Sequence, residues 1–222
     1  PENGNFQNLA VQTSFDIASL SLPMEHNKKT FPLEIPSLKG TVNLNQNKLI
    51  HKVNAKLLGG SVDVVGNLNI ENKKSANTTI KLKTIDLSSL DQFIPSISGS
   101  ISGDVKLKGH LPENGKIPNN LKVDTIFDLE NLRMPLEIKG KMVNAEISKI
   151  KGNVSLHRKK LNHNVSAKLL GGNISAKGNL LLKDSGTPHA VDTAIGLEHL
   201  DLVLVQRLKK GDWIPTSGKL AG

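Results

Sequence analysis

The feature that most constrains this chain is an internal duplication, in which the sequence returns at a spacing of 112 residues. The stretch from Gly40 to Leu68 matches the stretch from Gly152 to Leu180 at 16 of 29 positions, where chance would give about two. The likeness begins earlier, since Phe15-Asp16-Ile17 returns as Phe127-Asp128-Leu129. A duplication of this length favours two structurally equivalent units over one irregular domain.

The best-preserved part of the duplication predicts a β-hairpin. Leu57-Leu58-Gly59-Gly60 returns as Leu169-Leu170-Gly171-Gly172, and paired glycines tolerate the positive φ that tight hairpin turns require. The aliphatic residues around this turn are kept between the copies, whereas polar ones vary, as from Asp63 to Ser175. A reactive group would be kept before an aliphatic pattern, so the stretch indicates an architecture and not a catalytic site.

Apolar and polar residues alternate along most of the chain, as where Ile80 and Leu82 alternate with Lys81 and Lys83. This period of two predicts an antiparallel sheet with one apolar and one solvated face. Glycines such as Gly66 recur on the apolar face, where they permit bending or a close approach. A curved sheet and an ordinary core with β-bulges both remain open.

We therefore predict a mainly β fold, a curved antiparallel sheet of the β-groove type built from two tandem repeats. Each repeat is expected to contain one short helix, over 88–94 before Pro95 and over 202–208 before Pro215. The first repeat is placed at 1–110 and the second at 111–222, packed as one continuous domain. Because the chain begins at a proline and stops where the first repeat continues, we expect it to be a truncated piece of a longer protein.

Composition narrows the functional classes. There is no cysteine, which excludes disulfides and thiolate chemistry, and no run of about 18 apolar residues predicts a transmembrane helix. The net charge is +9 and aromatic residues make up 3%. Lysines scattered on solvated strand faces explain this charge, and without interleaved aromatic residues we expect no nucleic-acid partner. A polyanion-binding module is an alternative that rests on charge alone.

No constellation of residues indicates catalysis. His51 and His163 are repeat partners on the same strand face, but no second histidine or carboxylate repeats beside them at a metal-ligand spacing. Three carboxylate positions recur and fit turns and strand ends better than acid–base chemistry; they are Asp16/Asp128, Glu34/Glu146 and Asp86/Asp201. The sequence contains no Gly-x-Ser-x-Gly elbow, Walker loop, dinucleotide fingerprint or His-Glu-x-x-His motif. We predict a protein that is not an enzyme and has no metal or cofactor.

The order of motifs carries a family resemblance. Leu57-Leu58-Gly59-Gly60, an alternating strand to Gly66-Asn67-Leu68, then Ile85-Asp86-Leu87 and Ser98-Gly99-Ser100-Ile101-Ser102-Gly103 resemble the AsmA-like family of bridge-like lipid transfer proteins. The resemblance implies a protein in the periplasm of a Gram-negative bacterium, held in the inner membrane by an N-terminal anchor that we expect to be missing from this piece. It also implies phospholipid transfer to the outer membrane, with acyl chains in a repeated β-groove, and possible envelope protein partners.

Two functions follow as hypotheses. In the first, the apolar face binds acyl chains of phospholipid and helps to move it between the inner and outer membranes; the lining residues would be Val62, Val64, Leu68, Ile70, Ile80, Leu82, Ile101, Val105, Leu107, Ile174, Ala176, Leu180 and Leu182. In the second, the apolar face is a dry core, and the protein is a scaffold whose edge strands assist outer-membrane protein assembly or envelope maintenance without conducting lipid.

Overall fold

The computed structural model describes residues 10–26, 29–70, 74–91, 95–114, 116–138, 141–169, 171–201 and 219–220. These residues are mainly β-strand, and every strand pair is antiparallel. The elements are β1 (Ala10–Ile17), β2 (Leu20–His26), β3 (Lys29–Ile35), β4 (Ser37–Asn45), β5 (Lys48–Leu57), β6 (Gly60–Asn69), β7 (Ser75–Asp86), the 3-10 helix η1 (Leu87–Leu90), β8 (Ser98–His110), β9 (Lys122–Ile138), β10 (Lys141–His157), β11 (Lys160–Leu169), β12 (Gly172–Leu182), β13 (Pro188–Glu198), β14 (Leu200–Asp201) and β15 (Lys219–Leu220).

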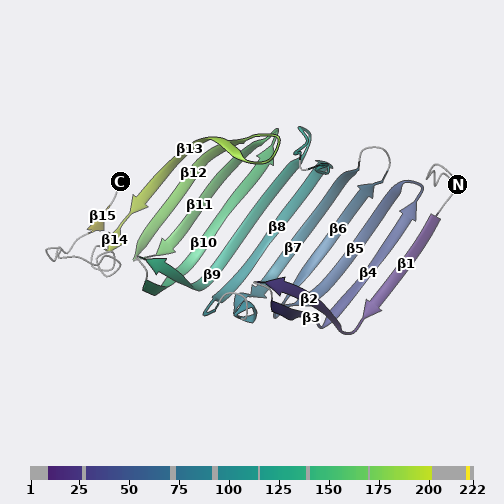
Figure 1. The fold of residues 1–222 in the computed structure, drawn as a ribbon, viewed down its shortest axis with the longest axis horizontal. Helices are drawn as coiled ribbons and strands as arrows, with labels where there is room; N and C mark the ends of the chain where they lie inside the picture. The colour runs from purple at the N-terminus through teal and green to yellow at the C-terminus, as the bar shows by residue number, and fades with distance from the viewer. Residues whose placement is uncertain are drawn as a thin grey trace.

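One wide sheet dominates the structure (Figure 1). It contains eleven strands in the order β1-β4-β5-β6-β7-β8-β9-β10-β11-β12-β13, so neighbours in sequence are almost always neighbours in space. Strands β1 and β13 are its two edges, and the sheet does not close on itself. The pairs β2–β3 and β14–β15 form two small separate sheets. The prediction of a mainly antiparallel β fold is confirmed.

The duplication is visible strand by strand. Strands β5 and β11 are repeat partners with bounds that differ by the sequence spacing, and β6 and β12 begin at equivalent glycines. The two halves join where β8 of the first repeat pairs with β9 of the second. At one end of this pairing Lys108 lies opposite Lys122, and at the other end Ser98 lies opposite Arg133. One uninterrupted sheet therefore runs through both repeats.

The repeats differ at one hairpin. In the second repeat β9 and β10 pair as two long strands, whereas the equivalent residues of the first repeat are divided into β1 and β2 on one side and β3 and β4 on the other. Pro36 lies between β3 and β4, at the position that Ser148 occupies in the second repeat. Proline has no backbone N–H to donate to a strand ladder, which explains why the first hairpin separates from the sheet.

The turn between β5 and β6 is not centred on the two glycines, because its residues with positive φ lie one position earlier in the sequence. Positive φ falls on Leu58 (47°) and Gly59 (70°), which connect β5 to β6. Gly60 already belongs to β6, and a Cβ there would lie 2.3 Å from the carbonyl oxygen of Lys83. The second glycine is therefore required by the close approach of β7 and not by the turn.

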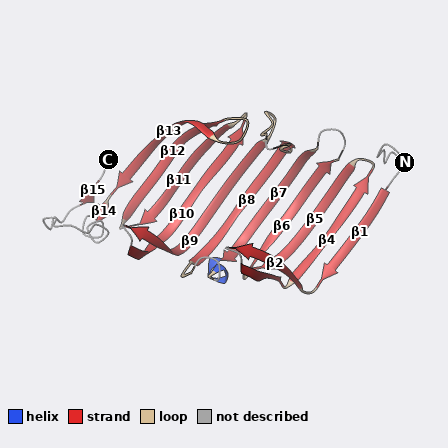
Figure 2. Ribbon diagram, in the orientation of Figure 1, coloured by secondary structure: helices blue, strands red, loops and turns tan. Residues whose placement is uncertain are grey.

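The short helix predicted over 88–94 is not confirmed as a whole, because residues 92–94 lie outside the described part of the chain. The described part of this segment is a single 3-10 turn over four residues, Leu87–Leu90, and no α-helix occurs among the described residues (Figure 2). Asp86, and not Ser88, is the N-cap residue, since its carboxylate accepts a hydrogen bond from the backbone N–H of Ser88 at 2.9 Å. The equivalent segment at 202–208 lies outside the described residues.

The buried apolar side chains among the described residues are few and lie toward the ends of the strands. Near the end that carries the glycine-rich turns and the β2–β3 hairpin they are Ile35, Ile85, Leu132 and Leu200; toward the opposite end they are Ala76 and Leu121. No large side chain is fully buried in this part of the chain. Across the middle of the sheet, therefore, the described residues form a single layer without a second layer packed on it.

Candidate functional site

Strand register places the predicted lining residues on one face of the wide sheet. Val64 lies opposite Ile80, and Ile80 lies opposite Val105, so the three form a row across β6, β7 and β8. The row continues through Thr125, Val154 and His163 to reach β12. Because paired residues in a sheet share a face, the apolar face is continuous from the first repeat into the second.

The predicted lining residues fall into two groups on this apolar face. Twelve lie within strands: Val62, Val64 and Leu68 in β6; Ile80 and Leu82 in β7; Ile101, Val105 and Leu107 in β8; and Ile174, Ala176, Leu180 and Leu182 in β12. Ile70 directly follows β6. All of them are partly exposed and none is buried. Neighbouring strands bring the first-repeat residues together, whereas the β12 group is separated from them by β9, β10 and β11.

The sequence analysis missed the residues that fill this interval. Phe127 in β9 lies opposite Gly103, and Leu129 lies opposite Ile101, so both extend the apolar rows of the first repeat. Val165 in β11 lies opposite Ala176. The duplication carried the signal for them, since Val165 is the repeat partner of Val53 in the same alternating pattern.

One polar bridge interrupts the apolar face in each repeat. His51 and Thr78 lie on either side of Gly66, and their side chains approach to 3.5 Å between Nε2 and Oγ1. The second repeat has the same arrangement, in which His163 and Thr193 approach to 3.2 Å across Gly178. The central residue must lack a side chain for the pair to meet. A structural role thus accounts for both histidines.

The glycines of the apolar face are also sites of close approach between strands. A Cβ at Gly178 would lie 2.0 Å from the carbonyl oxygen of Asp192, and one at Gly66 would lie 2.4 Å from that of Asn77. At Gly103 the obstacle is the carbonyl oxygen of Ile126, also at 2.4 Å. In each case the backbone of the next strand occupies the space above the glycine.

The apolar face is most exposed at the sheet edge formed by β13. Val191 and Ile195 pair with Leu180 and Ala176 of β12, and their exposed fractions are 66% and 67%. Their other flank has no neighbouring strand in the wide sheet. Among the described strands, this edge combines a flank of β13 that no strand of the wide sheet pairs with and large apolar side chains.

The opposite face carries cross-strand ion pairs. Lys83 Nζ lies 2.8 Å from Asp63 Oδ2, and Asn54 donates a hydrogen bond to the same carboxylate at 2.6 Å. The hydrogen bond from Lys83 is the main reason that the pKa of Asp63 is lowered. Lys149 lies between Asp128 and Glu130 at 2.9 and 2.8 Å, and these carboxylates raise its pKa. These pairs keep one face in water and leave the other apolar.

The repeated carboxylates also form surface contacts. Asp16 pairs with Lys39 at 2.9 Å, and Glu34 accepts a hydrogen bond from Ser21 at 2.7 Å. Within the described ranges no group of three or more histidine, aspartate and glutamate side chains could hold a metal ion. The same part of the chain contains no helix long and apolar enough to cross a membrane.

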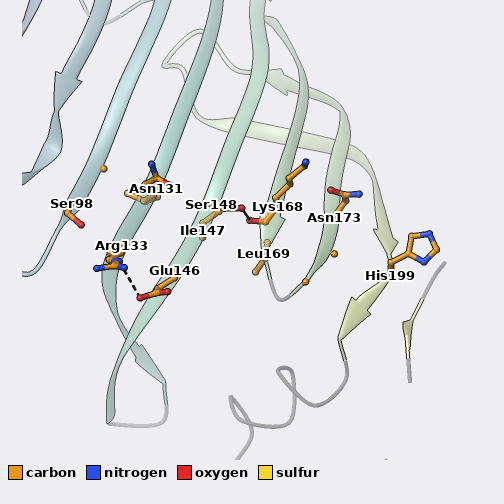
Figure 3. A pocket seen from close by; sticks show the side chains of 14 residues that line it. Ser98, Asn131, Arg133, Glu146, Ile147, Ser148, Lys168, Leu169, Asn173 and His199 are labelled. Carbon is orange, nitrogen blue, oxygen red and sulfur yellow. Dashed lines mark hydrogen bonds and ion pairs between the residues drawn. The ribbon is translucent and has the colours of Figure 1, made fainter. Parts of the chain in front are cut away.

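A pocket of about 970 Å³ lies where β8 to β12 approach the glycine-rich turn of the second repeat (Figure 3). We call it the strand-end pocket. Sequence analysis did not identify it, since it depends on the packing of five strands. Its lining residues are Ser98, Gly99, Asn131, Leu132, Arg133, Glu146, Ile147, Ser148, Lys168, Leu169, Gly171, Gly172, Asn173 and His199.

No family model, curated protein or solved structure matches this chain in the comparisons with known proteins. The function must therefore be argued from the geometry of the apolar face and the strand-end pocket.

Proposed function

We propose that this chain is a β-groove module of an AsmA-like periplasmic envelope protein, and that it binds acyl chains on the apolar face and helps to move phospholipid between the inner and outer membranes. The observation that carries the proposal is the exposure of this face. Aliphatic rows cross the wide sheet through both repeats, and no second layer among the described residues covers their middle part. Contiguous exposed apolar surface of this extent marks an interaction site.

The chemistry of the face suits a hydrocarbon chain. Its residues are aliphatic, so they recognise no particular headgroup or base, and each CH₂ that a ligand buries contributes about 0.8 kcal/mol. Eleven strands at a spacing of about 4.8 Å extend for roughly 48 Å across the sheet. A path of this length, with the same chemistry throughout, is what a conduit for lipid requires.

Curvature toward the apolar face is part of the proposal, and the glycines support it. At Gly66, Gly103 and Gly178 the carbonyl oxygen of the next strand lies 2.0–2.4 Å from where a Cβ would stand on the apolar side. Glycine within a strand permits a bend where another backbone approaches closely, and we propose that the sheet bends at these three positions. The buried residues near the strand ends, such as Ile85 and Leu121, would then border the trough on both sides.

Site-specific photocrosslinking tests this proposal with an internal control. Val64 lies on the apolar face and the adjacent Val65, with an exposed fraction of 49%, lies on the charged face. A photoreactive residue at Val64 or Ala176 should capture phospholipid, as detected by mass spectrometry, whereas one at Val65 should not. Equal capture at Val64 and Val65, or no capture at Val64 and Ala176, would refute acyl-chain binding on this face.

The scaffold hypothesis is favoured by a different observation, the exposed edge at β13. Val191 and Ile195 are exposed there beside a flank of β13 that no described strand of the wide sheet pairs with, and such edges add strands from partner proteins. Replacing Ala176 with aspartate separates the two functions. A groove should keep its fold and lose lipid capture, because Ala176 is only partly buried. A scaffold whose apolar face is a dry core should instead unfold.

A further inference from the structure

We infer that the strand-end pocket of the second repeat binds a phosphate group, either on a lipid headgroup or on a soluble phosphorylated molecule. Arg133 and Lys168 bring two cations to its lining, and Asn131 and Asn173 bring side-chain amides. These residues belong to β9, β11 and β12 and all line the pocket; in Figure 3 Arg133 lies beside Glu146, and Lys168 extends away from that pair. Arginine, lysine and amide donors together form the group set that recognises phosphate oxygens.

Comparison of the two repeats shows that Asn131, Arg133 and Asn173 are not part of the common architecture, whereas Lys168 is shared with Lys56 of the first repeat. At the equivalent positions of the first repeat, Ser19 stands in place of Asn131 and Ser21 in place of Arg133. Likewise Ser61 corresponds to Asn173, and Thr84 to His199. Every one of these differences places a larger donor or a cation in the second repeat.

The frame around these substitutions is unchanged. Leu132, Glu146, Ile147, Lys168 and Leu169 have the identical residue 112 positions earlier. Thr84 and His199 share a left-handed backbone, with φ of 49° and 55°. Both copies therefore have a lysine at the position of Lys168, and only the second copy adds Arg133 and the amides of Asn131 and Asn173 to it.

The single carboxylate in the pocket does not oppose binding strongly. Glu146 Oε1 lies 3.2 Å from Arg133 Nε, and both side chains are about two-thirds exposed, at 67% and 64%. Ion pairs with this exposure are weak, so a phosphate can compete with Glu146 for the guanidinium. Lys168 makes no ion pair among the described residues; its backbone oxygen accepts a hydrogen bond from Ser148 at 3.1 Å. Its ammonium group is available to a ligand.

Two probes distinguish the possible sources of the phosphate. Glycerol 3-phosphate represents a soluble ester, and its binding is followed by amide shifts in a ¹H–¹⁵N NMR titration of the full chain. Vesicles of phosphatidic acid in phosphatidylcholine represent a headgroup, with pure phosphatidylcholine vesicles as the reference. Binding of both probes, or of either one alone, supports the inference and identifies the source. Absence of both interactions overturns it.

Matched variants show whether the pocket, and not the net charge of +9, is responsible. Lys168→Gln should weaken binding about tenfold, the loss expected for one charged contact to phosphate. Lys56→Gln removes the same exposed charge from the equivalent position of the first repeat and should change binding less than twofold. Equal losses in the two variants would overturn the inference. The pair Arg133→Ser and His199→Thr, which installs first-repeat residues, should also weaken binding without unfolding the chain.

The inference does not rest on acyl-chain binding. Failure of crosslinking at Val64 and Ala176 would leave the strand-end pocket unaffected, because the pocket lies near the strand ends of β8 to β12. Conversely, a null titration with both phosphate probes would leave the acyl-chain proposal in place.

Discussion

Alanine at Gly178 is the sharpest test of the packing between β12 and β13. The added Cβ would lie 2.0 Å from the carbonyl oxygen of Asp192 and 2.6 Å from the Cα of Thr193. Ordinary contact needs 3.4–4 Å, so β13 must move by more than 1 Å. Overpacking lowers the free energy of unfolding by about 1–3 kcal/mol. We expect Gly178→Ala to lie at the upper end of this range, because the atoms that the new Cβ would meet belong to the backbone and cannot rotate away. Displacement also threatens the contact between His163 and Thr193, worth about 1 kcal/mol.

The assay is urea unfolding followed by far-UV circular dichroism, together with thermal melts. A loss of about 3 kcal/mol corresponds to a fall in Tm of roughly 6–12 °C for a chain of this length. Gly196→Ala is the matched control, because its new Cβ would meet only the Oγ of Ser175, at 2.6 Å, and that side chain can rotate. We expect it to lose less than about 1 kcal/mol. If both variants lose the same stability, the close approach of the two backbones is not what selects glycine at Gly178.

Three further predictions concern residues in contrasting environments. Leu132→Ala should lower the free energy of unfolding in urea by about 2–4 kcal/mol, because Leu132 is buried with an exposed fraction of 6%. Val191→Ala should lower it by less than about 0.5 kcal/mol, because Val191 is 66% exposed. Similar losses in the two variants would contradict the assigned burial. Asp86→Ala removes the N-cap of η1 and should lower the Tm through a loss of about 1 kcal/mol, and an unchanged Tm would show that the cap is dispensable. Asp63 has a lowered pKa in the folded state because of Lys83, so its contribution is present above the ordinary value of 3.8 and is lost as pH falls through the folded pKa. The stability difference between wild type and Asp63→Asn should shrink as pH is lowered from about 5 to 2, and a constant difference would argue against this pair.

The sequence predicted local structure well because period-two alternation and glycine-rich turns act over short distances. It placed Val62 and Val64 on the same face as Ile80 and Leu82, and the register confirms that arrangement. For the segment after Asp86 it predicted a short helix, and the described residues there form a 3-10 turn over Leu87–Leu90 with Asp86 as its N-cap.

The strand-end pocket could not be predicted from local patterns. Ser98, Arg133 and Asn173 come from three different strands, and no spacing in the sequence indicates that they line one opening. What the sequence does contain is the difference between the repeats. Ser21 and Arg133 occupy equivalent positions in the two repeats. Only the structure shows that this replacement brings a cation to the lining of a pocket.

The two candidate sites differ in how well their residues are kept between the two repeats. Residues of the apolar face are kept between repeats, as Val53 and Val165 or Leu68 and Leu180 are, which is expected when both copies contact the same extended, featureless chain. Asn131, Arg133 and Asn173 of the strand-end pocket differ from their first-repeat partners while Lys168 is kept, as expected when one copy has acquired a ligand that the other does not bind. Exchanging Arg133 for serine should therefore change phosphate binding and leave capture at Val64 intact. Loss of both activities in this one variant would mean that the face and the pocket form a single site.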